Sequence, residues 1–445
     1  MDERTILDLI KEKKYVQIKK ELSEMNEVDI AELLDSLDSH MTLLIFRMLP
    51  KDLAVEVFAH FSIEQQIGIV NSITDKELEY IIDELFFDDM IDLLEEMPAN
   101  IVSKVLAYSK DDERRLINQF LKYPPDSAGS LTTIEYVELR KNMTVKEALS
   151  HIKKTGLNKE TVYTCYVTDR KRTLEGFISL RTLVVSELDE IIGDIMEDEV
   201  INVNTHDDQE TVADTFKKYG FVALPVVDKE QRLIGIITVD DIMDVMEQEA
   251  TEDFQIMAAM SPSDEAYLDT KVLTLAKHRL PWLLILMISA TFTGRIMGKF
   301  EDVLTSVVIL STFIPMLMDT GGNSGNQSST LIIRGLATGD ITTRDGLKVL
   351  WKELRISLIV GLVLSATNFV RLMTIEKVGF PISATVSLTI VITVVSAKLV
   401  GGILPILAKK LRLDPAIMAG PLITTIVDAL SLIVYFTIAT ALLGI

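Results

Sequence analysis

The carboxyl-terminal part of the chain alternates long apolar stretches with short polar connections. A helix needs about 20 mostly apolar residues to cross the hydrocarbon core of a bilayer. Five stretches meet this requirement, and they cover residues 280–297, 303–333, 356–373, 381–408 and 415–443. The second, fourth and fifth exceed the minimum, so we expect them to be tilted or broken. The sequence therefore predicts a five-helix transmembrane domain over residues 279–445.

Charge is divided unequally along the chain. Residues 1–270 contain 28 Lys and Arg against 57 Asp and Glu, a net charge of −29, whereas residues 271–445 contain 16 against 9, a net charge of +7. Of the basic residues flanking the spans, eleven lie on the side of the acidic part and four on the other. Because an excess of basic residues marks the cytoplasmic side, we expect the acidic part to be cytoplasmic. So acidic a chain is not expected to bind nucleic acid.

The amino terminus and the cysteine content agree with a cytoplasmic acidic part on a membrane anchor. The chain begins Met-Asp-Glu-Arg, which lacks the basic start and apolar core of a signal peptide. Its one cysteine, Cys165, excludes an internal disulfide framework, and we expect a buried strand residue there. The five histidines are scattered, which favours ordinary surface or core roles for all of them.

Residues 1–129 are predicted to form an all-helical domain. Apolar residues recur at three- and four-residue spacing, for example over residues 30–34 and 81–85. Two similar segments contain Pro50 and Pro98, 48 residues apart, and this period suits stacked helix pairs in a small superhelix. The segment that begins at Tyr123, with two prolines and a glycine, breaks the helical pattern and marks a boundary.

Residues 130–250 change to an α/β pattern. Each of two units of about 60 residues contains a helical segment followed by two strand-like segments, and these segments cover residues 162–168, 174–179, 223–227 and 233–238. This repetition resembles a tandem pair of cystathionine β-synthase (CBS) domains, which is an α/β fold. The second copy carries the stronger signature, from Ala223 to Asp228 and from Gly235 to Asp241.

The CBS resemblance implies a candidate nucleotide site in the second copy. In such domains a Thr followed three residues later by an Asp often holds an adenosine ribose and phosphate, and these positions are Thr238 and Asp241 here. Phe221 and Pro225 complete the candidate set. The first copy has Ser179 but also Thr182 at the Asp position, so a nucleotide is less expected there. A purely structural CBS pair remains the alternative.

Two acidic residues lie within the predicted spans. A carboxylate at the centre of a membrane helix costs about 2.5–3.5 kcal/mol on insertion scales, so it usually faces water, a partner charge or an ion. Asp428 lies deep in the last span, and Asp319 precedes a polar tract at residues 321–330. For Asp428 the alternative is a carboxylate hydrogen-bonded to Thr424 or Ser431 for packing alone. For the tract, a helix break or close packing of small residues competes with ion contact by the candidate pore-lining residues Asp319, Asn323, Asn326 and Gln327.

The order of the parts and three motifs, at residues 315–330, 414–416 and 424–428, resemble the bacterial magnesium transporter family MgtE. The resemblance covers nearly the whole chain and implies a homodimeric Mg²⁺ channel in the bacterial plasma (inner) membrane. It implies that Asp428 binds a hydrated ion, that Thr424 offers a backbone carbonyl and that Asp414 lies at the cytoplasmic mouth. Residues 251–278 would form a connecting helix along the membrane face. ATP is a further regulatory ligand that the family suggests.

The same resemblance implies regulatory Mg²⁺ sites in the acidic part. The acids carried over from the family are Asp88, Asp92, Asp241, Asp244, Glu249, Glu252 and Asp253. One further family acid corresponds to Gly220 here, so fewer sites are possible. Crowded carboxylates repel each other, so bound Mg²⁺ would favour a compact, closed state when internal Mg²⁺ is high.

The residue types in the spans favour Mg²⁺ as the ion and argue against an enzyme or an anion channel. Mg²⁺ prefers six oxygen ligands and gives up water reluctantly, and the last span has no His or Cys that would favour Zn²⁺ or Cu. A membrane-anchored divalent-cation sensor that conducts nothing is the main alternative. No nucleophile–base pairing or phosphate-binding loop favours an enzyme, and intramembrane acids would repel the substrate of an anion channel.

Overall fold

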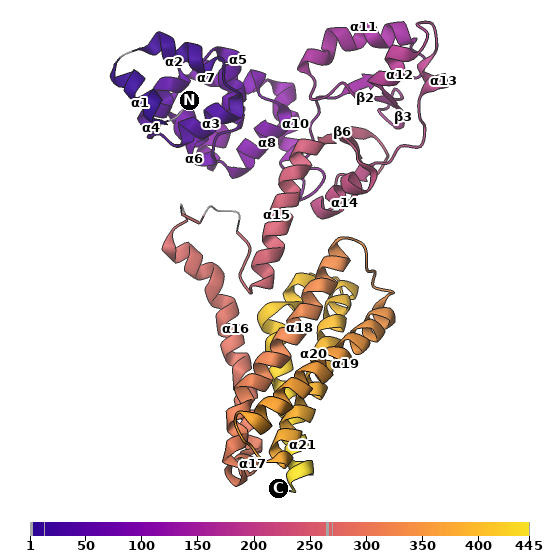
Figure 1. Ribbon diagram of the computed structural model, residues 1–445. Coiled ribbons are helices and arrows are strands. Elements are labelled where there is room, and N and C mark those ends of the chain that lie inside the picture. The colour runs from indigo at the N-terminus through magenta and orange to yellow at the C-terminus, as the bar shows by residue number, and fades with distance from the viewer. Residues whose placement is uncertain (1–2, 13, 264–266, 269, 445) are drawn as a thin grey trace. The chain divides into compact units, whose positions relative to one another are not determined.

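The computed structural model describes residues 3–12, 14–263, 267–268 and 270–444. It divides into two compact units, Met1–Met246 and Glu247–Ile445 (Figure 1).

The amino-terminal part of the first unit is built from short helices around one hydrophobic core. Pro50 directly precedes α5 and Pro98 directly precedes α9, so the sequence repeat marks two equivalent helix starts. Other helices are capped by side chains at their amino-terminal ends. At α7, Thr74 and Glu77 form a reciprocal capping box. The helices are α1 (Glu3–Lys11), α2 (Tyr15–Leu22), α3 (Glu27–Asp35), α4 (Ser39–Phe46), α5 (Lys51–Ala59), α6 (Ile63–Ser72), α7 (Asp75–Glu84), α8 (Phe87–Glu96), α9 (Ala99–Tyr108) and α10 (Asp111–Phe120).

Two three-stranded sheets of the same topology follow, with strand orders β1-β2-β3 and β4-β5-β6. In each, the first strand pairs parallel and the third pairs antiparallel with the central strand. The strands are β1 (Val137–Leu139), β2 (Thr164–Thr168), β3 (Leu174–Ser179), β4 (Val203–Asn204), β5 (Ala223–Val227) and β6 (Leu233–Thr238). The helices are α11 (Val145–Thr155), the 3₁₀ turn η1 (Gly156–Asn158), α12 (Leu180–Val185), α13 (Ile192–Ile195), α14 (Gln209–Tyr219) and α15 (Val239–Met257). The predicted helical domain and α/β repeat are confirmed, and β1 and β4 are additional strands.

The second unit is a helical bundle. It consists of α16 (Val272–Lys299), α17 (Glu301–Ser306), the 3₁₀ turn η2 (Val308–Phe313), α18 (Ile314–Ala337), α19 (Gly346–Thr374), α20 (Phe380–Lys410), the 3₁₀ turn η3 (Pro415–Met418) and α21 (Gly420–Leu443). Within the described residues, four segments are long and apolar enough to cross a membrane: α16, α19, α20 and Pro415–Leu443. The predicted number of five spans is therefore not confirmed.

The span predicted at residues 303–333 is the one that differs. It is divided among α17, η2 and α18, and the break lies at residues 307–313. The polar tract at residues 321–330 does not break the helix, because α18 continues through it. Its serines, asparagines and glutamine lower the apolar content of α18.

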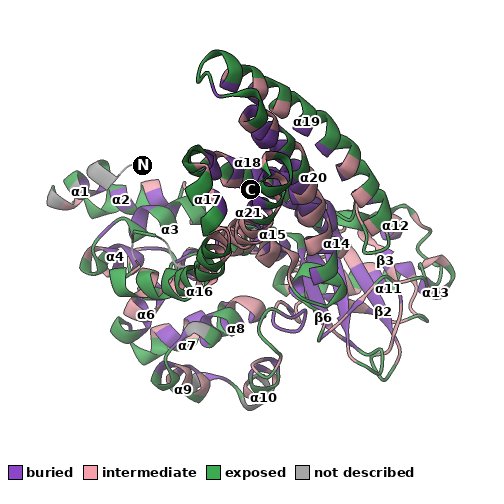
Figure 2. Cartoon of the chain, turned by 90° about the horizontal axis from the view of Figure 1, so that it is seen from below, coloured by how far each residue is buried: buried purple, intermediate pink, exposed green. Residues whose placement is uncertain are grey.

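Burial separates the helices of this unit. The inner residues of α18 and α20 are largely buried, whereas α16 has no buried residue and α19 is exposed along one side (Figure 2). Helices that cross a membrane can expose apolar side chains to lipid, so exposure of α16 and α19 is compatible with a stable bundle.

Glycines in the polar tract allow close helix packing. A Cβ added at Gly321 would lie 2.7 Å from Ser431 Oγ of α21, and one at Gly325 would lie 2.8 Å from Ile423 Cγ2. On α20, a Cβ at Gly401 would lie 2.3 Å from the carbonyl oxygen of Gly325. The small residues therefore bring α18, α20 and α21 together, as in other helix pairs of membrane proteins.

Gly401→Ala should lower the melting temperature of the detergent-solubilised full-length chain. Its methyl group would press on the backbone of Gly325, and overpacking of this kind costs about 1–3 kcal/mol. Gly294→Ala is the matched control, because a Cβ there meets no heavy atom within 4 Å. Equal melting temperatures for the two variants would contradict the close α18–α20 contact.

Candidate functional site

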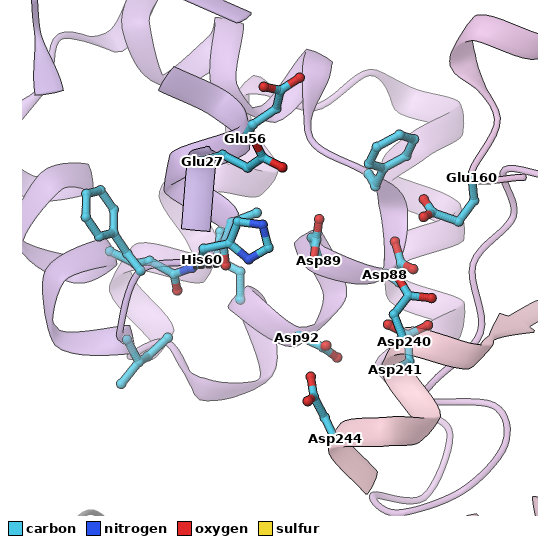
Figure 3. A pocket seen from close by; sticks show the side chains of 16 residues that line it. Glu27, Glu56, His60, Asp88, Asp89, Asp92, Glu160, Asp240, Asp241 and Asp244 are labelled. Carbon is cyan, nitrogen blue, oxygen red and sulfur yellow. Dashed lines mark hydrogen bonds between the residues drawn. The ribbon is translucent and has the colours of Figure 1, made fainter. Parts of the chain in front are cut away.

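An acidic cavity of about 660 Å³ lies within the first unit (Figure 3). Helix α8 contributes Asp88, Asp89 and Asp92, and the start of α15 contributes a second triplet with the same spacing. Residues three and four apart share one side of a helix, so each triplet points its carboxylates in similar directions. Nine carboxylates line the cavity, those of Glu27, Glu56, Asp88, Asp89, Asp92, Glu160, Asp240, Asp241 and Asp244. Among the described lining residues there is no Lys or Arg.

Burial and mutual repulsion oppose ionisation of these acids. Burial raises the pKa of Asp88 to about 9, with further contributions from the charges of Asp241 and Asp89. Asp88 Oδ1 is buried and has no hydrogen-bond partner in the part of the chain that the structure describes. Burial, with repulsion from Asp240, likewise raises the pKa of Glu160 to about 7. Burial raises the pKa of Asp241 to about 6, although a hydrogen bond from Thr238 opposes the shift. The cavity therefore favours a bound cation or bound protons.

The cavity contains four of the seven acids proposed as regulatory ligands: Asp88, Asp92, Asp241 and Asp244. The other three, Glu249, Glu252 and Asp253, are further along α15, in the second unit, and do not line it. The predicted set omitted Glu27, Glu56, His60, Asp89, Glu160 and Asp240. Helical spacing from Asp92 and Asp244 could have identified Asp89 and Asp240, whereas no sequence signal marks Glu160, which follows η1 in a connecting segment.

The acids are spread over the cavity wall. Within the described ranges, no three His, Cys, Asp or Glu side chains are grouped so that they could hold a metal ion. The arrangement fits a hydrated cation bound through its water shell better than a bare ion held by several protein ligands, since Mg²⁺ keeps several of its waters in most protein sites.

The candidate nucleotide residues surround the end of the second sheet. Thr238 is buried at the end of β6, and its hydroxyl donates to Asp241 Oδ2 at 2.7 Å. Phe221 stacks on Tyr219, with ring centroids 5.4 Å apart, and Pro225 lies in β5. In the first copy the equivalent pair is Ser179 and Thr182, whose hydroxyls are 2.8 Å apart. Asp241 thus belongs both to the nucleotide candidates and to the acidic cavity.

Asp428 lies in α21 without a hydrogen bond to the side chains considered as packing partners. Its Oδ1 atom is buried and has no partner among the described residues. Thr424 donates to Gly420 O at 3.1 Å, and Ser431 donates to Val427 O at 2.7 Å, so both hydroxyls bond the helix backbone instead. The packing alternative for Asp428 therefore finds no support in these contacts.

The other candidate ion-contacting residues of the second unit, Thr424, Asp414 and Asp319, differ in their hydrogen bonds and exposure. The carbonyl of Thr424 belongs to the continuous helix α21. Asp414 caps η3 by accepting a hydrogen bond from the Ala416 amide at 2.7 Å. Asp319 is exposed on α18 and accepts a hydrogen bond from Asn323 Nδ2 at 3.0 Å.

A cavity of about 960 Å³ lies in the second unit, and we call it the polar chamber after its polar side chains, although Met257, Leu331, Ile356 and Val360 also line it. Three of the four pore-lining candidates, Asn323, Asn326 and Gln327, line it, whereas Asp319 does not. Asn326 Oδ1 is buried without a partner in the described structure. Two charged residues that the sequence analysis did not assign, Glu353 and Lys398, also line the chamber.

Family comparisons cover most of the chain. The model described as "MgtE intracellular N domain" matches residues 2–126, the CBS domain model matches residues 192–248, and the MgtE model described as "Divalent cation transporter" matches residues 314–438. The magnesium transporter MgtE of Thermus thermophilus is 37% identical over 95% of this chain and 94% of its own length. That of Bacillus subtilis is 33% identical over 98% of this chain and 96% of its own length.

Solved structures agree with the first unit. The cytosolic domain of the Mg²⁺ channel MgtE in complex with ATP is 35% identical, has a TM-score of 0.52, and covers 55% of this chain and 99% of that chain. The soluble part of a magnesium transporter is 30% identical with the same TM-score, and covers 56% of this chain and 98% of its own. The chain therefore belongs to the MgtE family of divalent cation transporters.

Proposed function

We propose that this chain forms a Mg²⁺-selective channel that imports Mg²⁺ across the bacterial plasma membrane and closes when Mg²⁺ binds its cytoplasmic acidic domains. The observation on which this proposal rests is Asp428, an acid within an apolar span whose buried carboxylate oxygen has no hydrogen-bond partner among the described residues. Unpaired charge at this depth is retained where it meets water or an ion. Relatives named as magnesium transporters over almost the full length support Mg²⁺ as the substrate.

Conduction is proposed to use two copies of the chain. One Asp428 per subunit, facing its counterpart across a central axis, would hold a hydrated Mg²⁺ through its water shell. Such outer-sphere contact binds the ion without removing all of its water, so that it can also leave. The absence of buried residues on α16 supports an assembly in which lipid and a second copy cover this helix. Thr424 and Asp414 would contact the hydrated ion nearer the cytoplasmic end of α21.

Gating is proposed to depend on the acidic cavity. Its nine carboxylates repel one another when the α8 and α15 triplets approach. A divalent cation between them removes this repulsion and favours the compact arrangement. High internal Mg²⁺ then selects the closed channel, and low Mg²⁺ releases it. Glu249, Glu252 and Asp253 on the later part of α15 would add further Mg²⁺ ligands to the sensor.

ATP is proposed as a second regulatory ligand. A relative's cytosolic domain has been solved with ATP, and the nucleotide candidates Phe221, Pro225, Thr238 and Asp241 are grouped around β5 and β6 here. Because Asp241 also lines the acidic cavity, nucleotide at Thr238 would act on the same carboxylate that senses Mg²⁺.

Reconstituted vesicles test conduction and gating together. The full-length chain is placed in liposomes that contain a Mg²⁺ indicator, and flux is measured with low and then high Mg²⁺ on the cytoplasmic face. We expect flux at low Mg²⁺ and strong inhibition at high Mg²⁺. Flux that does not respond to cytoplasmic Mg²⁺ would overturn the gating, and no flux at all would favour a membrane-anchored sensor.

A further inference from the structure

Helices α18, α19 and α20 enclose two opposite charges beside the polar chamber. Lys398 of α20 is 4% exposed, and Glu353 of α19 is 6% exposed. Both are buried far more than charged residues usually are. A charge inside a membrane bundle normally marks a functional position, and neither residue has a part in the hydrated-ion site at Asp428.

Ser328 of α18 connects the two charges. Its hydroxyl donates to Glu353 Oε2 at 2.6 Å and accepts from Lys398 Nζ at 3.4 Å. Lys398 Nζ also donates to Ser324 O and to Gln327 Oε1, each at 3.5 Å. We call the Lys398–Ser328–Glu353 set the buried relay. The hydroxyl of Ser328 therefore lies between the side chains of Lys398 and Glu353.

The chamber wall continues to the residues proposed for conduction. Asn323 lines the chamber and donates to Asp319. The neighbouring Gly322 packs against Thr424, since a Cβ there would lie 3.0 Å from Thr424 Cγ2. Thr424 is one turn before Asp428 on α21. The buried relay is therefore one helix away from the candidate ion path.

The charges of Lys398 and Glu353 contribute to the net charge of the chamber and thereby affect its affinity for a cation. With both charges present, their sum is zero, and the remaining lining groups include neutral amide and hydroxyl oxygens. Such oxygens hold a hydrated cation weakly, which conduction requires. Without Lys398, an uncompensated carboxylate would retain divalent cations. Without Glu353, an uncompensated ammonium group would repel them.

We propose that the buried relay sets the net charge of the polar chamber and thereby how tightly Mg²⁺ is held on its way past Asp428. Lys398 and Glu353 thus act on the ion through their charges. This inference rests on the proposed conduction of Mg²⁺. Its particular claim is that opposite single changes shift the apparent affinity in opposite directions.

Charge-removing variants of the full-length chain in liposomes test the inference. Lys398→Met should lower the half-saturating Mg²⁺ concentration of flux, and Glu353→Gln should raise it, each by at least about tenfold, because a unit charge within about 10 Å of a divalent ion acts strongly at the effective dielectric constant of a protein. Lys398→Met should also lower the maximal flux, because a retained ion leaves slowly. The double variant Lys398→Met/Glu353→Gln restores neutrality and should return the half-saturating concentration to within about twofold of the wild type.

Ser328→Ala separates electrostatics from packing, because it removes the bridge and leaves both charges. It should shift the half-saturating concentration less than either single charge change. The inference would be overturned if neither single variant changed the half-saturating Mg²⁺ concentration, or if both shifted it in the same direction. It would also be overturned if the double variant were no nearer to the wild type than the more affected single variant. If Lys398→Met does not fold, Glu353→Gln alone decides, since an unchanged or lowered half-saturating concentration contradicts the proposal. Absence of flux in the wild type would instead refute the proposed conduction.

Discussion

Asp428→Asn should reduce Mg²⁺ flux through the reconstituted full-length chain by more than about tenfold. A carboxylate about 5 Å from a unit positive charge contributes about 3 kcal/mol at an effective dielectric constant of 20, and a hydrated divalent ion would lose this attraction from two subunits at once. Asparagine keeps the size and one oxygen of the side chain, so the change isolates charge. The initial rate of Mg²⁺ entry into indicator-loaded vesicles measures the effect.

Two control variants distinguish an ion site from general damage to the bundle. Asp302→Asn removes an exposed acid on α17 and should leave the flux close to that of the wild type. Ser431→Ala removes the hydroxyl that bonds Val427 O on α21 and should change stability more than flux. Wild-type flux in Asp428→Asn would remove the basis for conduction and favour a sensor that signals to a partner.

The fold class was accessible from the sequence because its main signals are local. Strands β3, β5 and β6 coincide with the predicted segments at residues 174–179, 223–227 and 233–238, where apolar residues are bounded by turn residues. The short strands β1 and β4 were not predicted, since three and two residues are too few to show a period. They become strands through parallel pairing with β2 and β5.

The span at residues 303–333 shows what apolar length can and cannot indicate. Its excess length favoured a tilted or broken helix, and a 3₁₀ segment does divide it before α18. The polar tract serves close packing through Gly321 and Gly325. Sequence spacing cannot reveal which glycines face a neighbouring helix, because that depends on residues of α20 and α21 that are about 70 to 110 positions away. Polar residues inside a span therefore indicate a function or a tight contact without separating the two.

The prediction of site residues was likewise limited, because contacts between distant parts of the chain are not visible in the sequence. Asp88, Asp92, Asp241 and Asp244 were named by resemblance, and the structure places them around one cavity. Glu160 comes from a different part of the chain and is brought to the cavity by tertiary packing alone. The buried relay is not accessible from the sequence for a similar reason. Lys398 lies within the predicted span at residues 381–408, but its connection to Glu353 through Ser328 requires three helices to pack together.

Opening of the acidic cavity should become easier as pH rises when Mg²⁺ is absent. Asp241, Glu160 and Asp88 have pKa values raised to about 6, about 7 and about 9. A raised pKa in the folded state means that the stabilising contribution is complete below the ordinary pKa near 4 and is lost as pH rises through the raised value. For each proton kept only by the closed state, the loss is at most about 1.4 kcal/mol per pH unit. This loss of stability can be measured between pH 5 and 9 by hydrogen exchange of the α8 amides in the full-length chain, corrected for intrinsic exchange.

Mg²⁺ should reverse this loss, and the reversal should depend on Asp88. A cation stabilises the ionised acids, so protection of α8 by Mg²⁺ should be large at pH 8 and small at pH 5, where protons already neutralise part of the cluster. Asp88→Asn removes the most strongly perturbed charge and supplies an amide donor to the neighbouring carboxylates, so α8 should be more protected without Mg²⁺ and less sensitive to pH. Asp83→Asn is the matched control, because Asp83 is exposed on α7 and its ion pair with Lys110 contributes at most about 1 kcal/mol. If protection by Mg²⁺ were as large at pH 5 as at pH 8, or if Asp88→Asn behaved like Asp83→Asn, the cation would have to bind elsewhere, and the acidic cavity would not be the sensor.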